Sequence, residues 1–302
     1  MERSVLVVDA FAPEGRALRA HVDSRFADPR VASPARFVWD LWHVPGQYTA
    51  LRTPAWTYFP KALYESFHRR LVLFGRSVLG CHDVSPPWLS CYVEGFGQEL
   101  HGDLPHGPWA FVYSLTRWRG RAFRGGETLI LRDRVLDHWT GFRSVRRLER
   151  PELFRTVAPR LGRLVVFDPR VPHAVAPVHG TLAPERGRIV IHGWFVNPRP
   201  FVQGPLPARE LAGRIGELSA GMAALLGGLP LAGLLSIGLA VSPSGAVRGT
   251  RVLSDTTRAP SGAEAERRRF VARVRAALTS WRFSRRARGS RITLPLVFER
   301  GD

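Results

Sequence analysis

Three side chains in the middle of the sequence have the chemistry of a metal site. His101 and Asp103 are separated by a single glycine, and a spacing of two places both side chains on the same side of an extended segment. His173 follows in the turn-and-strand segment FDPRVPHAV. Two imidazoles and one carboxylate on one face of Fe(II) leave coordination positions open for other ligands. An H-x-D tripeptide alone is a weak signal, because most are exposed histidines near a turn aspartate, so the prediction depends on the surrounding elements.

Arg188 is the next candidate for chemistry. It stands directly before the apolar run IVI, which predicts that it begins a buried strand. A planar guanidinium can bind a carboxylate through two parallel hydrogen bonds. Arg186 lies two residues earlier, on the same face of the expected strand, and is the competing candidate. Either arginine has the chemistry to anchor an anionic co-substrate, and an ordinary surface position is the alternative for both.

Six short apolar or alternating runs supply the elements that would hold these residues. Each is bounded by Gly, Pro or Asp, and in order they are LSCYVEG, WAFVYSLT, ETLILR, RLVVFDP, HAVAPVHG and RIVIHGWFV. This rhythm predicts an all-β sandwich or jelly roll. Before it, the pattern predicts a strand over 4–9 that leads into a helix, and an apolar stripe at a spacing of four predicts a helix over 60–79. The expected fold is mostly β with flanking helices.

The order of these motifs resembles the prolyl-hydroxylase-like branch of the 2-oxoglutarate/Fe(II) oxygenases. Members of this family show a tyrosine-bearing strand before H-x-D, a Gly-Gly-x-x-Leu strand, a Gly-x-Leu-x-x-Phe strand leading to the distal histidine, and a basic residue shortly before a tryptophan. Those positions are taken here by Tyr92, Gly125-Gly126, Gly162 to Phe167, His173, Arg188 and Trp194. The resemblance implies a double-stranded β-helix, a jelly-roll or cupin-like core over 88–197, inside an oxygenase domain over 1–200. It also implies Fe(II), 2-oxoglutarate and O2, with ascorbate as a candidate reductant.

The resemblance assigns roles around the metal. The His–Asp–His set is expected to bind Fe(II), and the spacing to Trp194 favours Arg188 over Arg186 as the partner of the distal carboxylate of 2-oxoglutarate. Tyr92 is expected to donate its hydroxyl to the co-substrate, with an ordinary core tyrosine as the alternative. Ser114 stands where relatives often carry a second hydroxyl that binds the co-substrate.

Strand parity adds a residue that the family pattern does not give. On the last strand of the core, Arg188, Val190, His192 and Trp194 share one face. If Arg188 points into the barrel, His192 does too, and we expect it to contact 2-oxoglutarate or the substrate without binding the metal. His106, in the loop LPHGPW, faces either substrate or solvent. We take Trp194 and His106 as the candidate substrate contacts.

The composition limits other classes of function. With 302 residues and 45% hydrophobic residues, the chain can form one large domain, or a medium domain with a small one. The net charge of +19 comes from arginine, since Lys61 is the only lysine, and this bias indicates genome composition more than a phosphate-binding patch. Two cysteines, Cys81 and Cys91, are too few for a disulfide framework. The N-terminus lacks a signal-peptide pattern and Gly and Pro interrupt the apolar stretch 222–241, so a cytoplasmic protein without a membrane span is expected.

The last part of the chain predicts a second unit. LSIGLAV and AVRGTRVLS predict a hairpin, a helix is expected over 262–281, and RITLPLVFE predicts a final strand, which gives a small α+β unit in the order ββαβ. The hairpin, the Trp-Arg-Phe at the helix end and the last strand resemble the TonB C-terminal-like domain over 232–302, after a linker with one helix over 201–231. The resemblance implies a module for a protein partner or for self-association, such as peptide-strand addition. A basic appendage that only stabilises the chain is the alternative.

The leading hypothesis is therefore a 2-oxoglutarate- and Fe(II)-dependent dioxygenase. It would hydroxylate an aliphatic C–H bond of a peptide or protein residue, or of an amino-acid-derived small molecule. A nucleic-acid-modifying oxygenase is one alternative, but Trp194 stands where repair oxygenases carry a second arginine. A non-catalytic metal-binding scaffold is another, and the complete ligand set together with Arg188 argues against it.

Overall fold

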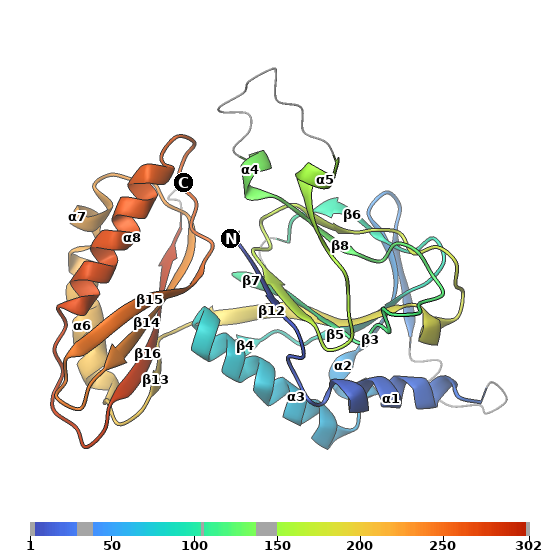
Figure 1. Cartoon of the computed structure of the whole chain (residues 1–302), viewed down its shortest axis with the longest axis horizontal. Helices are drawn as coiled ribbons and strands as arrows, with labels where there is room; N and C mark the ends of the chain where they lie inside the picture. Colours follow the sequence, from blue (N-terminus) through green and yellow to red (C-terminus); the bar gives the residue numbers. More distant parts are fainter. Residues whose placement is uncertain (1–3, 29–38, 104–105, 137–149, 300–302) are drawn as a thin grey trace. The chain divides into compact units, whose positions relative to one another are not determined.

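The computed structural model describes residues 4–28, 39–103, 106–136 and 150–299. The chain divides into two compact units (Figure 1). The first unit comprises Met1–Val72 and Val84–Val196, and the second comprises Leu73–Asp83 and Asn197–Asp302. In the described part of the chain the strands form one sheet of twelve strands and another of four.

The twelve-stranded sheet follows the order β1-β10-β7-β12-β5-β3-β6-β11-β8-β9, with β2 beside β3 and β4 beside β12. Its strands are β1 (Val5–Val8), β2 (Asp40–Val44), β3 (Tyr48–Pro54), β4 (Cys81–Val84), β5 (Trp88–Tyr92), β6 (Gln98–His101), β7 (Trp109–Ser114), β8 (Thr128–Leu131), β9 (Phe154–Val157), β10 (Leu164–Phe167), β11 (His173–Val175) and β12 (Arg188–Pro198).

The sheet is strongly curled, so that two groups of strands face each other. In Figure 1, β5 and β12 lie across from β6 and β8. The two groups meet where β3 pairs with β6 through Tyr48 and Gln98. All six apolar runs of the sequence form strands, which confirms the prediction of a mostly β fold with helices, consistent with a jelly-roll core. The hairpin of β2 and β3 was not predicted.

Helices flank this sheet, as the sequence predicted. They are α1 (Gly15–Phe26), α2 (Ala55–Tyr58), α3 (Lys61–Phe74), α4 (Asp133–Leu136) and α5 (Arg150–Leu153). The inward stripes of α1 and α3 are fully buried at Leu18, Val22, Phe67 and Leu71. Burying side chains of this size stabilises the unit by about 1.5–3 kcal/mol each, which accounts for the helices better than local propensity does.

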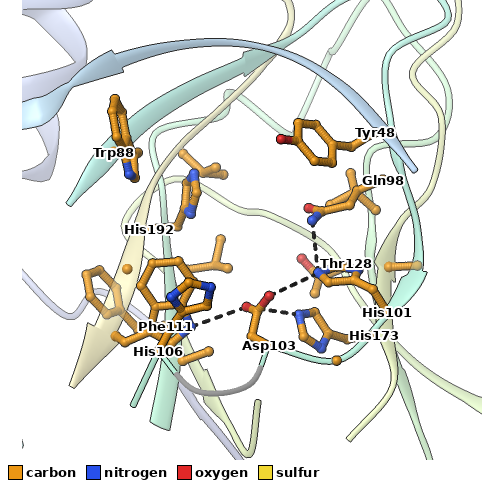
Figure 2. A pocket seen from close by; sticks show the side chains of 18 of the residues that line it. Tyr48, Trp88, Gln98, His101, Asp103, His106, Phe111, Thr128, His173 and His192 are labelled. Carbon is orange, nitrogen blue, oxygen red and sulfur yellow. Dashed lines mark hydrogen bonds and ion pairs between the residues drawn. The ribbon is translucent and has the colours of Figure 1, made fainter. Parts of the chain in front are cut away.

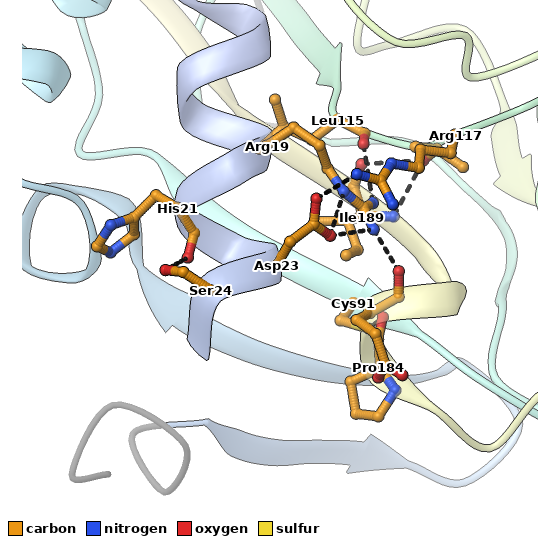
Figure 3. A network of polar contacts seen from close by, with 11 residues as sticks. Arg19, His21, Asp23, Ser24, Cys91, Leu115, Arg117, Pro184 and Ile189 are labelled. Carbon is orange, nitrogen blue, oxygen red and sulfur yellow. Dashed lines mark hydrogen bonds and ion pairs between the residues drawn. The ribbon is translucent and has the colours of Figure 1, made fainter. Parts of the chain in front are cut away.

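A buried arginine on α1 fixes the start of β12 (Figure 3). Arg19 is 2% exposed, and its guanidinium donates to the carbonyl oxygens of Leu115, at 3.0 Å, and Glu185. Asp23 balances its charge through a hydrogen bond of 3.0 Å from Arg19 Nε. Glu185 belongs to the 3-10 turn η4 (Pro184–Arg186), directly before Arg188. Removing one partner of a buried ion pair is strongly destabilising, so this cluster holds the turn in one position.

The second unit carries a sheet in the order β13-β16-β14-β15. Its elements are β13 (Phe201–Gln203), α6 (Ala208–Ala220), α7 (Met222–Leu226), β14 (Gly233–Val241), β15 (Val247–Asp255), α8 (Glu264–Thr279) and β16 (Ser290–Phe298). The predicted order ββαβ is therefore present from β14 to β16. Residues 201–231, expected as a linker with a helix, instead belong to this unit, because β13 pairs with β16 and Leu206, Leu211, Leu218 and Leu231 lie in its core.

Residues 73–83 join this unit through a π-helical turn, η2 (Gly75–Leu79). A π turn leaves backbone carbonyls without their usual helical partners. Ser236, Ser254 and Thr293 supply the missing donors, with hydroxyl-to-carbonyl distances of 2.6, 3.2 and 3.0 Å. The apolar stretch 222–241 forms α7 and β14, and within the described residues no helix has the length and apolarity to cross a membrane.

Candidate metal and co-substrate site

A cavity of about 900 Å³ lies between the two facing groups of strands in the first unit. One wall comes from β5, β7 and β12, and the other from β6, β8 and β11. Figure 2 shows side chains from both walls converging on the same space. Of the residues predicted from the sequence, the lining includes Tyr92, His101, Asp103, His106, His173, Arg188, His192 and Trp194.

The three candidate metal ligands lie together at one end of the cavity. His101 ends β6, His173 begins β11, and the two residues are direct partners in the ladder between these strands. One donor atom from each of His101, Asp103 and His173 lies within 4.8 Å of the others, so the set could hold a metal ion. His101 Nε2 is 3.4 Å from Asp103 Oδ1, and His173 Nε2 is 3.5 Å from Asp103 Oδ2.

Backbone carbonyls set the tautomer of both histidines. His101 Nδ1 lies 2.8 Å from the carbonyl oxygen of Glu99, and His173 Nδ1 lies 2.9 Å from that of Val171. A carbonyl can only accept, so each Nδ1 must carry the hydrogen. When the imidazoles are neutral, each Nε2 therefore carries the lone pair that a metal needs, and both Nε2 atoms lie beside Asp103. The donor set therefore fits a divalent transition metal such as Fe(II).

The charges of the cluster also suit a cation. Burial disfavours the charged form of Asp103, but hydrogen bonds from His101 and His173 outweigh it and hold the pKa of the carboxyl well below its usual range. Burial likewise lowers the pKa of His101, yet its bonds with Asp103 and the Glu99 carbonyl raise the pKa overall. Asp103 therefore supplies a carboxylate anion between two imidazoles, a donor set that suits a cation.

Trp194 and Gln98 support this end of the cavity. Trp194 Nε1 donates to Asp103 Oδ2 at 3.2 Å, and the ring of His106 stacks on Trp194 with centroids 4.5 Å apart. Gln98 Nε2 lies 2.9 Å from His101 Nε2. The sequence suggested Trp194 and His106 as substrate contacts, and both line the cavity. Neither the bond from Trp194 to Asp103 nor the presence of Gln98 was predicted.

Arg188 is a buried cation with unused donors. It is 1% exposed, and Nη2 donates to Thr128 Oγ1 at 3.2 Å, while Nε and Nη1 have no hydrogen-bond partner among the described residues. Its guanidinium carbon lies 4.7 Å from the ring centroid of Tyr92. Buried N–H groups without partners are costly, and a carboxylate is the acceptor that a planar guanidinium binds best. The competing Arg186 is exposed in η4.

The Gly-Gly pair allows the backbone to pass close to this arginine. Gly125 and Gly126 have φ values of +77° and +78°, which favour glycine. A Cβ on Gly125 would lie 1.8 Å from the carbonyl oxygen of Pro177, and one on Gly126 would lie 3.4 Å from Arg188 Cδ. The motif is thus explained by backbone conformation and close approach.

Ser114 is not brought to the cavity. It is buried at the end of β7, and its hydroxyl donates to the carbonyl oxygen of Pro159 at 2.6 Å. Among the described residues that line the cavity it is absent, because this local bond and the strand end keep the hydroxyl elsewhere. The structure therefore gives no support to its predicted role at the co-substrate.

Arg188, Val190, His192 and Trp194 of β12 all line the cavity, as strand parity predicts, while the expected contact of His192 with co-substrate or substrate stays a prediction. His192 Nε2 lies 2.7 Å from Ser90 Oγ. Burial lowers the pKa of His192 to about 3, and the charges of Arg52 and Arg188 act in the same direction. The imidazole is therefore neutral at physiological pH, and it offers hydrogen bonds without adding charge.

This histidine gives a pH-dependent stability. Below its ordinary pKa of 6.5 the unfolded chain binds a proton that the folded chain refuses, so the stability of the wild type must fall as pH drops from 6.5 toward 3. Between pH 7 and pH 5, we expect the melting temperature of His192→Gln to fall less than that of the wild type, as measured by circular dichroism. The exposed substitution His43→Gln should decline like the wild type. An equal fall in melting temperature for all three proteins would show that His192 is not the group responsible.

Sequence reasoning missed one part of the cavity. Trp42, Tyr48 and Arg52 on β2 and β3, with Trp88 on β5, also line it. The usable signal was the alternation of Tyr48, Ala50 and Arg52, which puts the first and last on one face of a strand. Thr128, the partner of Arg188, was missed as well.

Comparisons with known proteins agree with the geometry. Residues 87–196 match the family described as the 2OG-Fe(II) oxygenase superfamily. No curated protein matches the chain. The chain therefore carries a 2OG-Fe(II) oxygenase domain and is an oxidoreductase enzyme, and the family implies Fe(II), 2-oxoglutarate and O2.

Solved structures with prolyl hydroxylase names are among its structural neighbours. A Pseudomonas putida prolyl-4-hydroxylase is 18% identical, with 65% of this chain and 93% of that chain covered and a TM-score of 0.45. The Trichoplax adhaerens prolyl hydroxylase in complex with a hypoxia inducible factor peptide fragment is 14% identical, with 64% and 84% covered and a TM-score of 0.44. The epimerase SnoN from nogalamycin biosynthesis, dependent on alpha-ketoglutarate, is 13% identical, with 63% and 77% covered and a TM-score of 0.40.

Proposed function

We propose that this chain is a hydroxylase that uses Fe(II) and 2-oxoglutarate to oxidise an aliphatic C–H bond. The observation that carries the proposal is the convergence of two features on one cavity. One is the His–Asp–His cluster, whose two Nε2 atoms face a single carboxylate. The other is the buried Arg188, which has two nitrogen atoms without partners.

Each residue then has a stated role. His101, Asp103 and His173 would hold Fe(II), which supplies the activation of O2 when it is bound. Arg188, with Thr128 beside it, would bind the distal carboxylate of 2-oxoglutarate. Tyr92 lies against the Arg188 guanidinium and would form the wall of the co-substrate site on that side. Trp194 would hold Asp103 in its ligand orientation through the bond to Oδ2.

The proposed substrate is a peptide or protein residue, or an amino-acid-derived small molecule. A cavity of about 900 Å³ is at the upper end of the range for small-molecule sites, so there is room for a second molecule beside the co-substrate. The products would be the hydroxylated substrate, succinate and CO2.

An anaerobic titration tests the proposal. Fe(II) and 2-oxoglutarate added together should give a weak visible metal-to-ligand charge-transfer band, which neither gives alone. Admission of O2 with ascorbate as reductant should then release succinate, since such enzymes turn over slowly without substrate. A protein that binds neither Fe(II) nor 2-oxoglutarate, and shows no band, would overturn the proposed function.

For the second unit we keep the prediction of a docking module over 232–302. In the described part of its sheet, β15 stands at one edge, beside β14 alone. An edge strand offers backbone groups to a peptide strand from a protein partner or a second copy of the chain. The TonB C-terminal-like resemblance over these residues stays a proposal with it, while 201–231 belong to the same compact unit.

A further inference from the structure

One wall of the cavity combines three aromatic rings with an arginine. We call it the arginine wall, and it consists of Trp42, Tyr48, Arg52 and Trp88. The guanidinium carbon of Arg52 lies 5.3 Å from the ring centroid of Trp42 and 5.0 Å from that of Tyr48. Trp42 in turn packs on Trp88 with ring centroids 5.4 Å apart. In Figure 2, Tyr48 and Trp88 occupy the upper half of the view and the candidate metal ligands the lower half.

Arg52 has a buried N–H group without a partner among the residues that the structure describes. Its Nε is buried without a hydrogen-bond acceptor, and among the residues that the structure describes none forms an ion pair with it. The two flanking rings hold the planar group in place through cation–π contacts, which do not satisfy its N–H donors. A guanidinium that lines a cavity, between two rings and without an ion-pair partner among the described residues, is suited to receive an anion.

The charge of Arg52 acts inside the cavity. After burial, it is the largest of the causes that lower the pKa of His192, and Arg188 acts in the same direction. The cavity thus has two arginines, on β3 and on β12, of which Arg188 is the more deeply buried. Two separate cationic positions suit two anionic groups, and they disfavour a cationic substrate by repulsion.

We propose that the arginine wall is the substrate subsite, and that the substrate carries a carboxylate which Arg52 binds while its apolar body lies against Trp88. The identification of this ligand as the substrate rests on the proposed function. Arg52 is then a specificity-determining residue, which distinguishes acids from their uncharged analogues. Such discrimination is strong when a site is built around a polar partner, because the analogue leaves the site's donors unpaired.

A matched pair of probes tests this subsite without turnover. N-acetyl-L-leucine and its carboxamide have the same shape and differ in charge. Each is titrated by calorimetry into the anaerobic full-length protein loaded with Fe(II) and saturating 2-oxoglutarate, so that Arg188 is already occupied. We expect the acid to bind at least about tenfold more tightly than the amide, the size of one charge-assisted hydrogen bond.

Two variants assign the preference to its residue. Arg52→Gln should remove the preference for the acid, and Arg119→Gln, which removes the same charge at an exposed position, should retain it. Arg52→Lys keeps the charge without the planar fork and should retain only part of the preference. The wild-type comparison stands by itself if a variant fails to fold.

The outcomes separate the two proposals. Equal binding of acid and amide by the wild type, binding of neither, or an unchanged preference in Arg52→Gln overturns the subsite and leaves the proposed function intact. Failure to bind 2-oxoglutarate overturns the proposed function. In that case the same two probes, titrated into the metal-free protein and into Arg188→Met, still decide whether Arg52 receives a carboxylate.

Discussion

Asp103→Ala is expected to weaken Fe(II) binding by at least about 100-fold and to abolish turnover of 2-oxoglutarate. Loss of a residue that merely orients a ligand already costs 10–100-fold in metal affinity, and here a ligand itself is lost. Asp103 is the one carboxylate of the candidate set, with its two oxygens 3.4 and 3.5 Å from the two Nε2 atoms. Without it, two imidazoles face each other with ring centroids 4.3 Å apart and no anion between them. Anaerobic titration with Fe(II) measures the effect.

Glu99→Gln is the matched control for that result. Glu99 lies two residues before His101, is exposed, and contacts the His101 ring through its backbone carbonyl, which the substitution leaves in place. We therefore expect near wild-type Fe(II) affinity in this variant. Wild-type affinity in Asp103→Ala, or equal losses in both variants, would remove Asp103 from the ligand set.

The strands that hold the site could be predicted from the sequence, because they are apolar runs bounded by turn residues. LVVF over Leu164–Phe167 is buried throughout, and the last strand alternates between a core face and a cavity face. The hairpin of β2 and β3 could not be predicted from burial patterns, because β2 is exposed along most of its length. β2 is held by its pairing with β3 and by the contact of Trp42 with Trp88, and both depend on the tertiary structure. In the sequence, only the alternation of Tyr48, Ala50 and Arg52 pointed to the arginine wall, and the aromatic contacts that complete it are tertiary.

Within the site, strand parity placed residues correctly, whereas positions assigned from the family resemblance did not all reach the cavity. Parity on one strand placed His192 on the cavity face with Arg188, because the alternation of side chains is a property of the strand itself. Ser114 was assigned from a family position alone, and its hydroxyl is taken up by Pro159. Trp194 was found through its spacing from Arg188, but its bond to Asp103 joins residues far apart in the chain, which no local pattern reports.

In the second unit, the prediction of a linker overlooked the spacing of the leucines. Pro and Gly around 200–230 suggested a linker with one helix, and that helix is α6, yet its apolar face is buried, with Leu211 and Leu218 3% and 6% exposed. An amphipathic helix needs a surface to cover, and the sheet of this unit provides it. Composition therefore misled where periodicity would have been the better guide.

Arg188→Met is expected to weaken binding of 2-oxoglutarate by about 100- to 1,000-fold while leaving the folded protein as stable as the wild type, or more so. The loss follows from two charge-assisted hydrogen bonds to a buried carboxylate, together about 3–4 kcal/mol. The stability follows from burial, because Arg188 is 1% exposed and two of its nitrogen atoms lack partners. An apolar side chain of similar length relieves that cost.

The two readouts have opposite signs, and this separates a binding role from a structural one. An arginine that only supported the fold would, on replacement, lower the melting temperature and weaken 2-oxoglutarate binding together. Anaerobic calorimetry with 2-oxoglutarate and thermal unfolding without it measure the two effects on the same sample. Arg186→Met, an exposed position two residues away, should change neither. A destabilised Arg188→Met that still binds 2-oxoglutarate as the wild type does would transfer the co-substrate site to another cation, and Arg52 is the next one on the cavity wall.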